Sequence, residues 1–184
     1  MARMALEHAL LVALSERPAS GLELTRRFEK SLGFFWHATH QQIYRVLKRM
    51  EEAGWVAVDV VAQSGRPDKK VYTVSDGGHA ELVRWLAEPD PAAGPVELAV
   101  KIRGATFGDP AKVAEEIVRH RAKHAERLDV YRQIEKRDFP APANLHGRHL
   151  HQYLVLRGGI RVEEGQVEWF DEVLAALHHP KDAR

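Results

Sequence analysis

Polar side chains of complementary chemistry gather in the segment HATHQQIYRVLKRMEEAGWV, residues 37–56. A glutamine amide can donate and accept in one bidentate pair, and an arginine can bind two acceptors at once. Lysine and tyrosine can hold phosphate oxygens. The residues with this potential are Thr39, His40, Gln41, Gln42, Tyr44, Arg45 and Lys48. Together they offer the groups needed to bind a phosphate backbone and to read base edges.

The same segment carries apolar residues at helical spacing, namely Ile43, Val46, Leu47 and Met50. If this stripe faces the core, the polar side chains face outward. Thr39 and Gln42 match a capping box, which predicts the start of a helix. Gly54 predicts its end in a left-handed conformation, with Trp55 packing back on the last turn.

Eleven histidines suggest a second kind of site, one that binds metal. His120 and His124 stand four residues apart, a spacing that can chelate zinc on a helix, and a further cluster occurs at His146, His149 and His151. A zinc site needs a third or fourth ligand, and no carboxylate stands at a convincing spacing. We therefore predict no metal and no cofactor, although a histidine-based metal sensor remains an alternative.

Signatures of common enzyme classes are missing from the sequence: it has no P-loop, no G-x-S-x-G, no G-x-G-x-x-G before a helix and no H-E-x-x-H. It also has no cysteine, which excludes disulfides and thiolate catalysis and fits a reducing cytoplasm. No stretch approaches the roughly 18 uncharged apolar residues of a membrane span. We expect a cytoplasmic protein that is not an enzyme.

The elements around the polar segment follow a recognisable order. Helices are predicted for residues 3–16 and 20–31, before the one that begins at Thr39. The period then changes to two in residues 55–61 and 69–74, which predicts a hairpin whose tip carries Arg66, Lys69 and Lys70. Another helix is predicted from Ser75. The predicted fold is mainly α with a small β-hairpin.

Three helices followed by a hairpin form a winged helix-turn-helix, in which the third helix enters the DNA major groove and the wing contacts the backbone. The net charge of +1 gives no general sign of a polyanion partner, so this prediction depends on where the charges lie. We assign this domain to residues 1–88. A winged-helix module that binds an acidic protein partner is the alternative.

A linker and connecting segment is predicted for residues 89–108, since residues 87–95 are rich in Pro, Ala and Gly. Residues 109–184 are predicted to form a helical dimerisation domain, because they carry more large apolar residues than lone helices can bury. The predicted interface residues are Ile117, His124, Leu128, Tyr131, Tyr153, Trp169, Phe170 and Val173. A fold in which these helices pack back on their own winged helix is the alternative.

The sequence resembles the PadR family of bacterial transcriptional regulators. The likeness lies in ALLVALSERPASGLELTRRFE, HQQIYRVLKRMEEAGWV, SGRPDKKVYTVSDGGHAEL and YLVLRGGIRVEEGQVEWFDEVL. The resemblance implies a homodimer that binds an inverted-repeat operator in double-stranded DNA, usually as a repressor, and releases it when a small-molecule effector binds. It places the family's third helix on Gln42, Ile43 and Tyr44.

Overall fold

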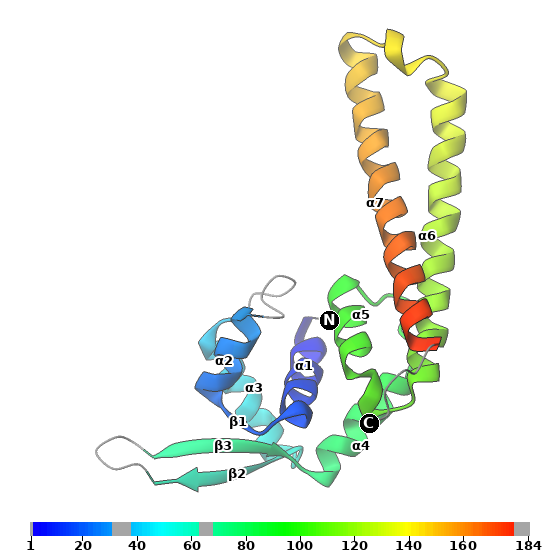
Figure 1. Cartoon of the computed structure of the whole chain (residues 1–184). Coiled ribbons are helices and arrows are strands. Elements are labelled where there is room, and N and C mark those ends of the chain that lie inside the picture. The colour runs from blue at the N-terminus through cyan, green and yellow to red at the C-terminus, as the bar shows by residue number, and fades with distance from the viewer. Residues whose placement is uncertain (1, 31–37, 63–67, 179–184) are drawn as a thin grey trace. The chain divides into compact units, whose positions relative to one another are not determined.

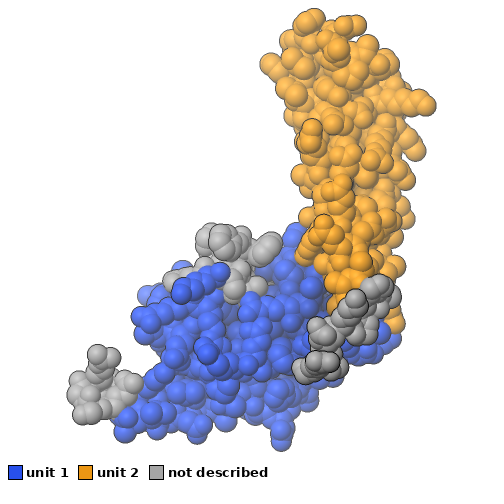
Figure 2. All heavy atoms as spheres, viewed as in Figure 1, with its two compact units in different colours: residues 1–113 blue, residues 114–184 orange. Residues whose placement is uncertain are grey.

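The computed structural model describes residues 2–30, 38–62 and 68–178 (Figure 1). The chain divides into two compact units, residues 1–113 and residues 114–184, which Figure 2 draws in blue and orange. The first unit is a winged helix-turn-helix and the second is helical, which confirms the predicted fold class.

Three helices form the core of the first unit: α1 (Ala2–Glu16), α2 (Gly21–Lys30) and α3 (His40–Glu52). Five of their inward-facing side chains are at most 2% exposed, namely Leu10, Leu24, Phe28, Ile43 and Leu47. The helical periodicity of the sequence therefore identified the buried faces of these helices correctly.

The sheet has three strands rather than the two predicted. Strand β2 (Val56–Val61) pairs antiparallel with β3 (Lys69–Val74), with Val56 opposite Val74 and Val61 opposite Lys69. Strand β1 (Ala19–Ser20) pairs with the other edge of β3. The sequence analysis missed β1 because two residues are too few to show a period of two.

The hairpin extends away from the helices that cover its base (Figure 1). The period of two places Val56, Val58 and Val60 on one side of the strand. The exposed fraction along this side rises from 5% at Val56 to 63% at Val60. An alternating pattern thus identified the strand correctly but did not show how far the core reaches along it.

Two more helices complete the first unit: α4 (Asp76–Ala87), with Ser75 as its N-cap, and α5 (Pro95–Gly104), followed by a 3₁₀ turn at Ala105–Phe107. Helix α5 lies inside the segment predicted as a connection, and it packs on α1. Its side chains at Leu98 and Val100 are buried. The first unit therefore reaches further along the chain than the predicted boundary at residue 88.

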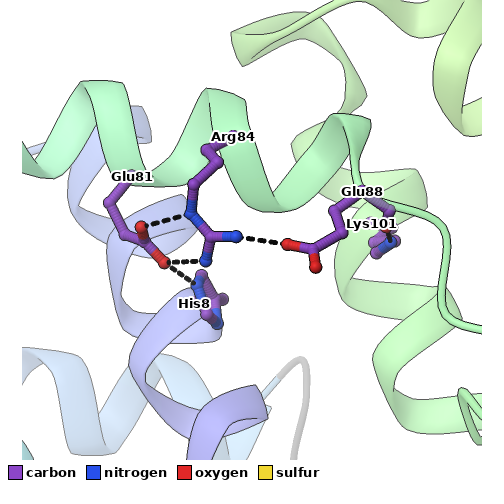
Figure 3. Close-up of polar contacts among 5 residues, drawn as sticks. All are labelled: His8, Glu81, Arg84, Glu88 and Lys101. Atoms are coloured by element: carbon purple, nitrogen blue, oxygen red, sulfur yellow. Dashed lines mark hydrogen bonds and ion pairs between the residues drawn. The ribbon is translucent and has the colours of Figure 1, made fainter.

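A polar contact joins α1 to α4 inside this unit (Figure 3). The buried His8 ring stacks on Trp85 with 4.3 Å between ring centroids, and its Nε2 lies 2.9 Å from the Glu81 carboxylate. Glu81 also accepts two hydrogen bonds from Arg84. These bonds, those from Arg84 first, hold the pKa of the Glu81 carboxyl below its usual value.

Lys101 joins α5 to α4 in the same region (Figure 3). Its side chain is 1% exposed, its Nζ donates to the backbone carbonyl of Glu88 at 2.5 Å, and the ammonium lies 5.2 Å from the Trp85 ring centroid. A buried cation needs such acceptors to offset the loss of water. Lys101 thus ties α5 to the end of α4.

Two long helices, α6 (Pro110–Asp138) and α7 (Gly147–His178), make up most of the second unit, with a 3₁₀ turn at Pro142–Asn144 between them. They run antiparallel, and ion pairs join Arg121 to Asp171 and Arg132 to Glu164. Ile160 and Phe170 on α7 are fully buried. None of the helices in the described part of the chain is long and apolar enough to cross a membrane.

Candidate nucleic-acid interface

Helix α3 places its polar face outward, as the sequence analysis expected. Ile43 and Leu47 are fully buried, whereas Tyr44 is 47% exposed. The side chain of Lys48 is 77% exposed, and His40, Gln41 and Arg45 are exposed too. One face of the helix therefore packs in the core and the opposite face is accessible to a partner.

The start of α3 is fixed by the predicted capping box. The Gln42 backbone N–H donates to Thr39 Oγ1 at 3.3 Å, and the Thr39 backbone N–H donates to Gln42 Oε1 at 2.9 Å. The prediction of this motif is confirmed. The same bond occupies the side-chain oxygen of Gln42, so this amide cannot offer both of its groups to a base while the cap is intact. Gln41 is then the glutamine of this segment that is predicted to make a bidentate base contact.

The end of α3 directs the chain into the hairpin. Gly54 has a φ of +72°, and the Trp55 backbone N–H donates to the Met50 carbonyl at 2.8 Å, while the Gly54 N–H donates to the Glu51 carbonyl. These are the two bonds of a Schellman motif, and they confirm the predicted left-handed end. Strand β2 begins two residues after Gly54, so this turn sets where the wing leaves α3.

A groove of about 930 Å³ lies between the polar face of α3, the first turn of α2 and strand β3. It is lined by Ser20, Gly21, Leu22, Glu23, Arg26, Tyr44, Lys48, Glu51, Glu52, Asp68, Lys69, Lys70 and Tyr72. The structure thus brings predicted interface residues from the third helix and from the hairpin to one surface.

Three lysines of this groove are paired with carboxylates. Lys69 Nζ lies 3.0 Å from Glu23 Oε1, and Lys70 Nζ lies 3.9 Å from Glu51 Oε2. Lys48 Nζ lies 3.7 Å from Glu52 Oε1 on the next turn of α3. Within the described residues, the Arg45 side chain has no ion-pair partner.

Glu23 is fixed at the start of α2. Its Oε2 accepts hydrogen bonds from the backbone N–H and the hydroxyl of Ser20, each at 2.8 Å, and its other oxygen accepts from Lys69. The backbone bond from Ser20, followed by the bond from Lys69, lowers the pKa of Glu23 to about 2. The same carboxylate thus caps α2 and holds a lysine of the wing.

The Tyr44 ring lies against the first turn of α2. A Cβ atom added to Gly21 would lie 2.5 Å from Tyr44 Cε1 and 2.7 Å from Cζ, closer than side chains pack. Only glycine leaves room for the ring at this place. Nearby, burial first and then the charge of Glu51 raise the pKa of Tyr72.

The predicted interface residues have different places in the structure. Lys69 and Lys70 lie in β3, opposite Val61 and Val60, and Arg66 lies outside the described residues. The sequence analysis did not identify Gly21, Arg26, Tyr72 or the acidic residues of the groove as parts of the site. Two of these residues could have been found from the sequence. Glu23 stands three residues after Ser20, the spacing of a capping motif, and Glu52 stands four residues after Lys48, the spacing of an ion pair on a helix.

The predicted dimer-interface residues differ in exposure. Ile117, Leu128 and Phe170 are buried within the single chain, at most 6% exposed. The other five, His124, Tyr131, Tyr153, Trp169 and Val173, are half-buried. The apolar side chains that are most exposed in α6 and α7 are different ones, namely Val118, Val130, Leu154, Val155 and Val162.

His124 packs within the helical pair. Its Nδ1 lies 2.5 Å from Glu163 Oε2, and Arg127 donates to the other oxygen of Glu163 at 3.1 Å. In the described part of the chain, no three histidine or carboxylate side chains are grouped so as to hold a metal ion. The described residues around His120 and His124 therefore do not form a group of three ligands for a metal ion.

Two family profiles match the sequence. The one described as the transcriptional regulator PadR-like family covers residues 10–84, and the one described as the virulence activator alpha C-terminal domain covers residues 96–178. The first runs from the second half of α1 into α4, and the second extends from α5 to the end of α7.

Known proteins match over nearly the whole chain. A probable transcriptional regulator of Mycobacterium tuberculosis is 52% identical over 189 residues, which cover 97% of this chain and 100% of the relative. The negative transcriptional regulator PadR of Bacillus subtilis is 27% identical, with 94% of this chain and 97% of the relative covered.

Solved structures give weaker likenesses. A crystal structure of Bacillus subtilis PadR in complex with operator DNA has a TM-score of 0.45 and 26% identity, covering 93% of this chain and 97% of that one. The Vibrio cholerae virulence activator AphA has a TM-score of 0.43 and 29% identity, covering 94% and 98%.

Proposed function

This chain belongs to the PadR-like family of transcriptional regulators, and from that premise we propose that it binds double-stranded operator DNA through its winged-helix unit. The observation that carries the proposal is the exposed, capped start of α3 beside a groove that continues onto the wing. A helix with this exposure fits the major groove, and a basic hairpin beside it fits the adjacent backbone.

The residues divide into two tasks. Gln41 and Arg45, at the exposed start of α3, read base edges, since arginine pairs with guanine and glutamine with adenine in the major groove. Tyr44, Lys48, Lys69 and Lys70 line the groove and hold phosphates, and Arg66 is assigned to the same task. Thr39, His40 and Gln42 complete the interface, with Thr39 and Gln42 positioning the first turn.

The active form that we propose is a homodimer joined through α6 and α7, which presents two copies of α3 to an inverted repeat with half-sites about one helical turn apart. The exposed valines and leucine of these helices support the proposal, because a lone helical pair leaves them in water. Buried Ile117, Leu128 and Phe170 then stabilise the protomer rather than contact the partner.

Repression relieved by a small-molecule effector is the regulatory mode that we propose. It is supported by the likeness to Bacillus subtilis PadR, which is named a negative transcriptional regulator, and a crystal structure of that protein contains p-coumaric acid. An effector can release DNA only if it binds more tightly to a form in which the two α3 helices no longer match the half-site spacing.

Substitution of Arg45 and Lys48 tests the DNA-binding face. A duplex selected from a random pool by the full-length protein serves as the ligand. Arg45→Ala removes a bidentate base contact and is expected to weaken binding by about 1 to 3 kcal/mol and to relax specificity. Lys48→Ala removes a phosphate contact and is expected to reduce the number of counterions released on binding by about one, which is measured from the slope of log affinity against log salt concentration.

Arg119→Ala, an exposed arginine of α6, is the matched control and should bind the duplex as the wild type does. Unchanged affinity of both Arg45→Ala and Lys48→Ala at low and high salt would contradict the assignment of this face. Failure of the wild type to retain any duplex at low salt would favour the protein-interaction alternative. Zinc or nickel retained after desalting would favour the metal-sensor alternative.

A further inference from the structure

The groove proposed to receive the DNA backbone is balanced in charge. Its lining includes four basic residues, Arg26, Lys48, Lys69 and Lys70, and four acidic ones, Glu23, Glu51, Glu52 and Asp68. A surface that binds phosphate by charge alone would carry an excess of cations. This groove instead contains as many competing carboxylates as cations.

The carboxylates are placed to compete with phosphate for the same ammonium groups. Each of the three lysines has one within 4 Å: Lys69 with Glu23, Lys70 with Glu51, and Lys48 with Glu52. These carboxylates come from two helices: Glu23 belongs to α2, and Glu51 and Glu52 belong to the last turn of α3. A phosphate that enters the groove must therefore compete with a carboxylate at each lysine.

We infer that Glu23, Glu51 and Glu52 are specificity-determining residues that lower the affinity of the winged helix for duplexes other than its operator. The inference depends on the DNA-binding function proposed above. These acidic residues are not among those proposed to read bases, but the inference gives them a part in the choice between duplexes.

The physical reason is a difference between the two kinds of complex. Binding to an unrelated duplex depends almost entirely on phosphate contacts, so each carboxylate that competes for a lysine weakens it directly. On the operator, base contacts by α3 fix the duplex in register and hold phosphates close to the lysines. In this register each lysine can offer a phosphate one of its remaining N–H donors while its ion pair with the carboxylate stays in place, so the carboxylates lower operator affinity little.

Glu23 is expected to act more strongly than Glu52. Its carboxylate is held by the backbone N–H and the hydroxyl of Ser20, so it stays near Lys69. Glu52 and Lys48 are both largely exposed, with 62% and 77% of their side chains accessible, and an ion pair this exposed is weak.

The test is a comparison of two affinities for each variant of the full-length protein. Glu23→Gln, Glu51→Gln and Glu52→Gln keep the shape of the side chain and remove its charge. Each is expected to raise affinity for a random-sequence duplex by about twofold to fivefold, and the triple variant on the order of tenfold or more. Affinity for the pool-selected duplex should change by less than about twofold. The ratio of the affinity for the selected duplex to the affinity for the random duplex should therefore fall.

Glu88→Gln is the matched control, because Glu88 is an exposed, ion-paired glutamate of the same unit that does not line the groove. It should leave both affinities unchanged. Thermal unfolding of each variant checks the fold, and if Glu23→Gln destabilises α2, the surface variant Glu52→Gln still tests the inference.

Three results would overturn it. One is an unchanged affinity of all variants for the random duplex, and another is an equal rise for both duplexes, which would mean that the carboxylates set affinity rather than specificity. A rise of the same size in Glu88→Gln would show an effect of net charge alone. Each of these leaves operator binding by the wild type intact, whereas a wild type that retains no duplex would overturn the proposed function as well.

Discussion

At the scale of single residues, the interface depends on the neighbours of each side chain, whether they are near or far in the sequence. Tyr44 was identified from its place on α3, but its ring position depends on Gly21, which comes from the start of α2. Gln42 was identified as a base-reading candidate, but its side-chain oxygen completes the cap of its own helix. In both cases, residue type suggested the chemistry and a neighbour decided how it is used.

Substitution of Gly21 tests the position of Tyr44 without removing any side chain that is proposed to contact DNA. Gly21→Ala is expected to weaken operator binding by roughly fivefold to tenfold, since the ring must move away and a bond to a phosphate is lost. The fold should tolerate the change, because the ring stands at the end of a side chain that is 47% exposed and can move.

A double-mutant cycle separates this effect from a general one. In a Tyr44→Ala background, Gly21→Ala should cost no further affinity, because the ring with which it clashes is absent. Equal losses in both backgrounds, with unchanged melting temperatures, would show that Gly21 does not act through Tyr44.

At the scale of elements, α2 and the hairpin are joined through one carboxylate. Glu23 accepts hydrogen bonds from Ser20 at the start of α2 and from Lys69 on β3, and Ser20 is also part of β1, which pairs with β3. The position of the wing relative to the helices is therefore set by the contact of Glu23 with Lys69 and by the pairing of β1 with β3.

The acid stability of the first unit should reflect this junction. The pKa of Glu23 is about 2 in the folded protein and near 4.5 for a free glutamate, so the carboxylate adds stability above about pH 4.5 and loses it as the pH falls toward 2. Glu23→Gln should lower the melting temperature at neutral pH and should flatten its decline between pH 5 and pH 2.

Lys69→Met provides the comparison. The backbone N–H of Ser20 is the first cause of the low pKa of Glu23, ahead of Lys69. This variant should therefore keep most of the pH dependence, as followed by circular dichroism melts in low-salt buffer. A complete loss of the pH dependence in Lys69→Met would instead identify Lys69 as the main cause of the low pKa of Glu23.

At the scale of the whole molecule, the helical unit leaves a regular stripe of α7 accessible. Val155 is 78% exposed and Val162 is 61% exposed, and a Cβ added to Gly158 or Gly165 would meet only open space. These four positions follow alternating intervals of three and four residues. Such a stripe suits close packing against another long helix, which supports the dimer proposed above.

A charge placed in this stripe should separate the protomers. Val155→Glu is expected to give a monomer in analytical ultracentrifugation at micromolar concentration and to weaken operator binding strongly, because two linked half-site contacts become independent. Its melting temperature should change little, apart from the part that dimerisation contributes. Val155→Ile keeps the surface apolar and should remain dimeric. A dimeric Val155→Glu variant would place the interface elsewhere.

Local signals in the sequence determined much of this protein. Thr39, Gln42 and Gly54 marked the ends of α3, and the apolar stripe from Ile43 to Met50 showed which face is buried. Capping and periodicity depend on residues within a few positions of one another, so they can be read without coordinates. The order of helices and strands then followed, and with it the winged helix.

Only the tertiary structure decided which groups meet across the chain. It added β1 and α5, placed Gly21 under Tyr44, paired Lys69 with Glu23 and Lys70 with Glu51, and buried Ile117 and Phe170 while leaving Val155 exposed. Contacts of this kind join residues tens of positions apart, and their geometry depends on how whole elements pack. Residue spacing carries no record of that packing, because periodicity shows which side of a helix is apolar but not what covers it.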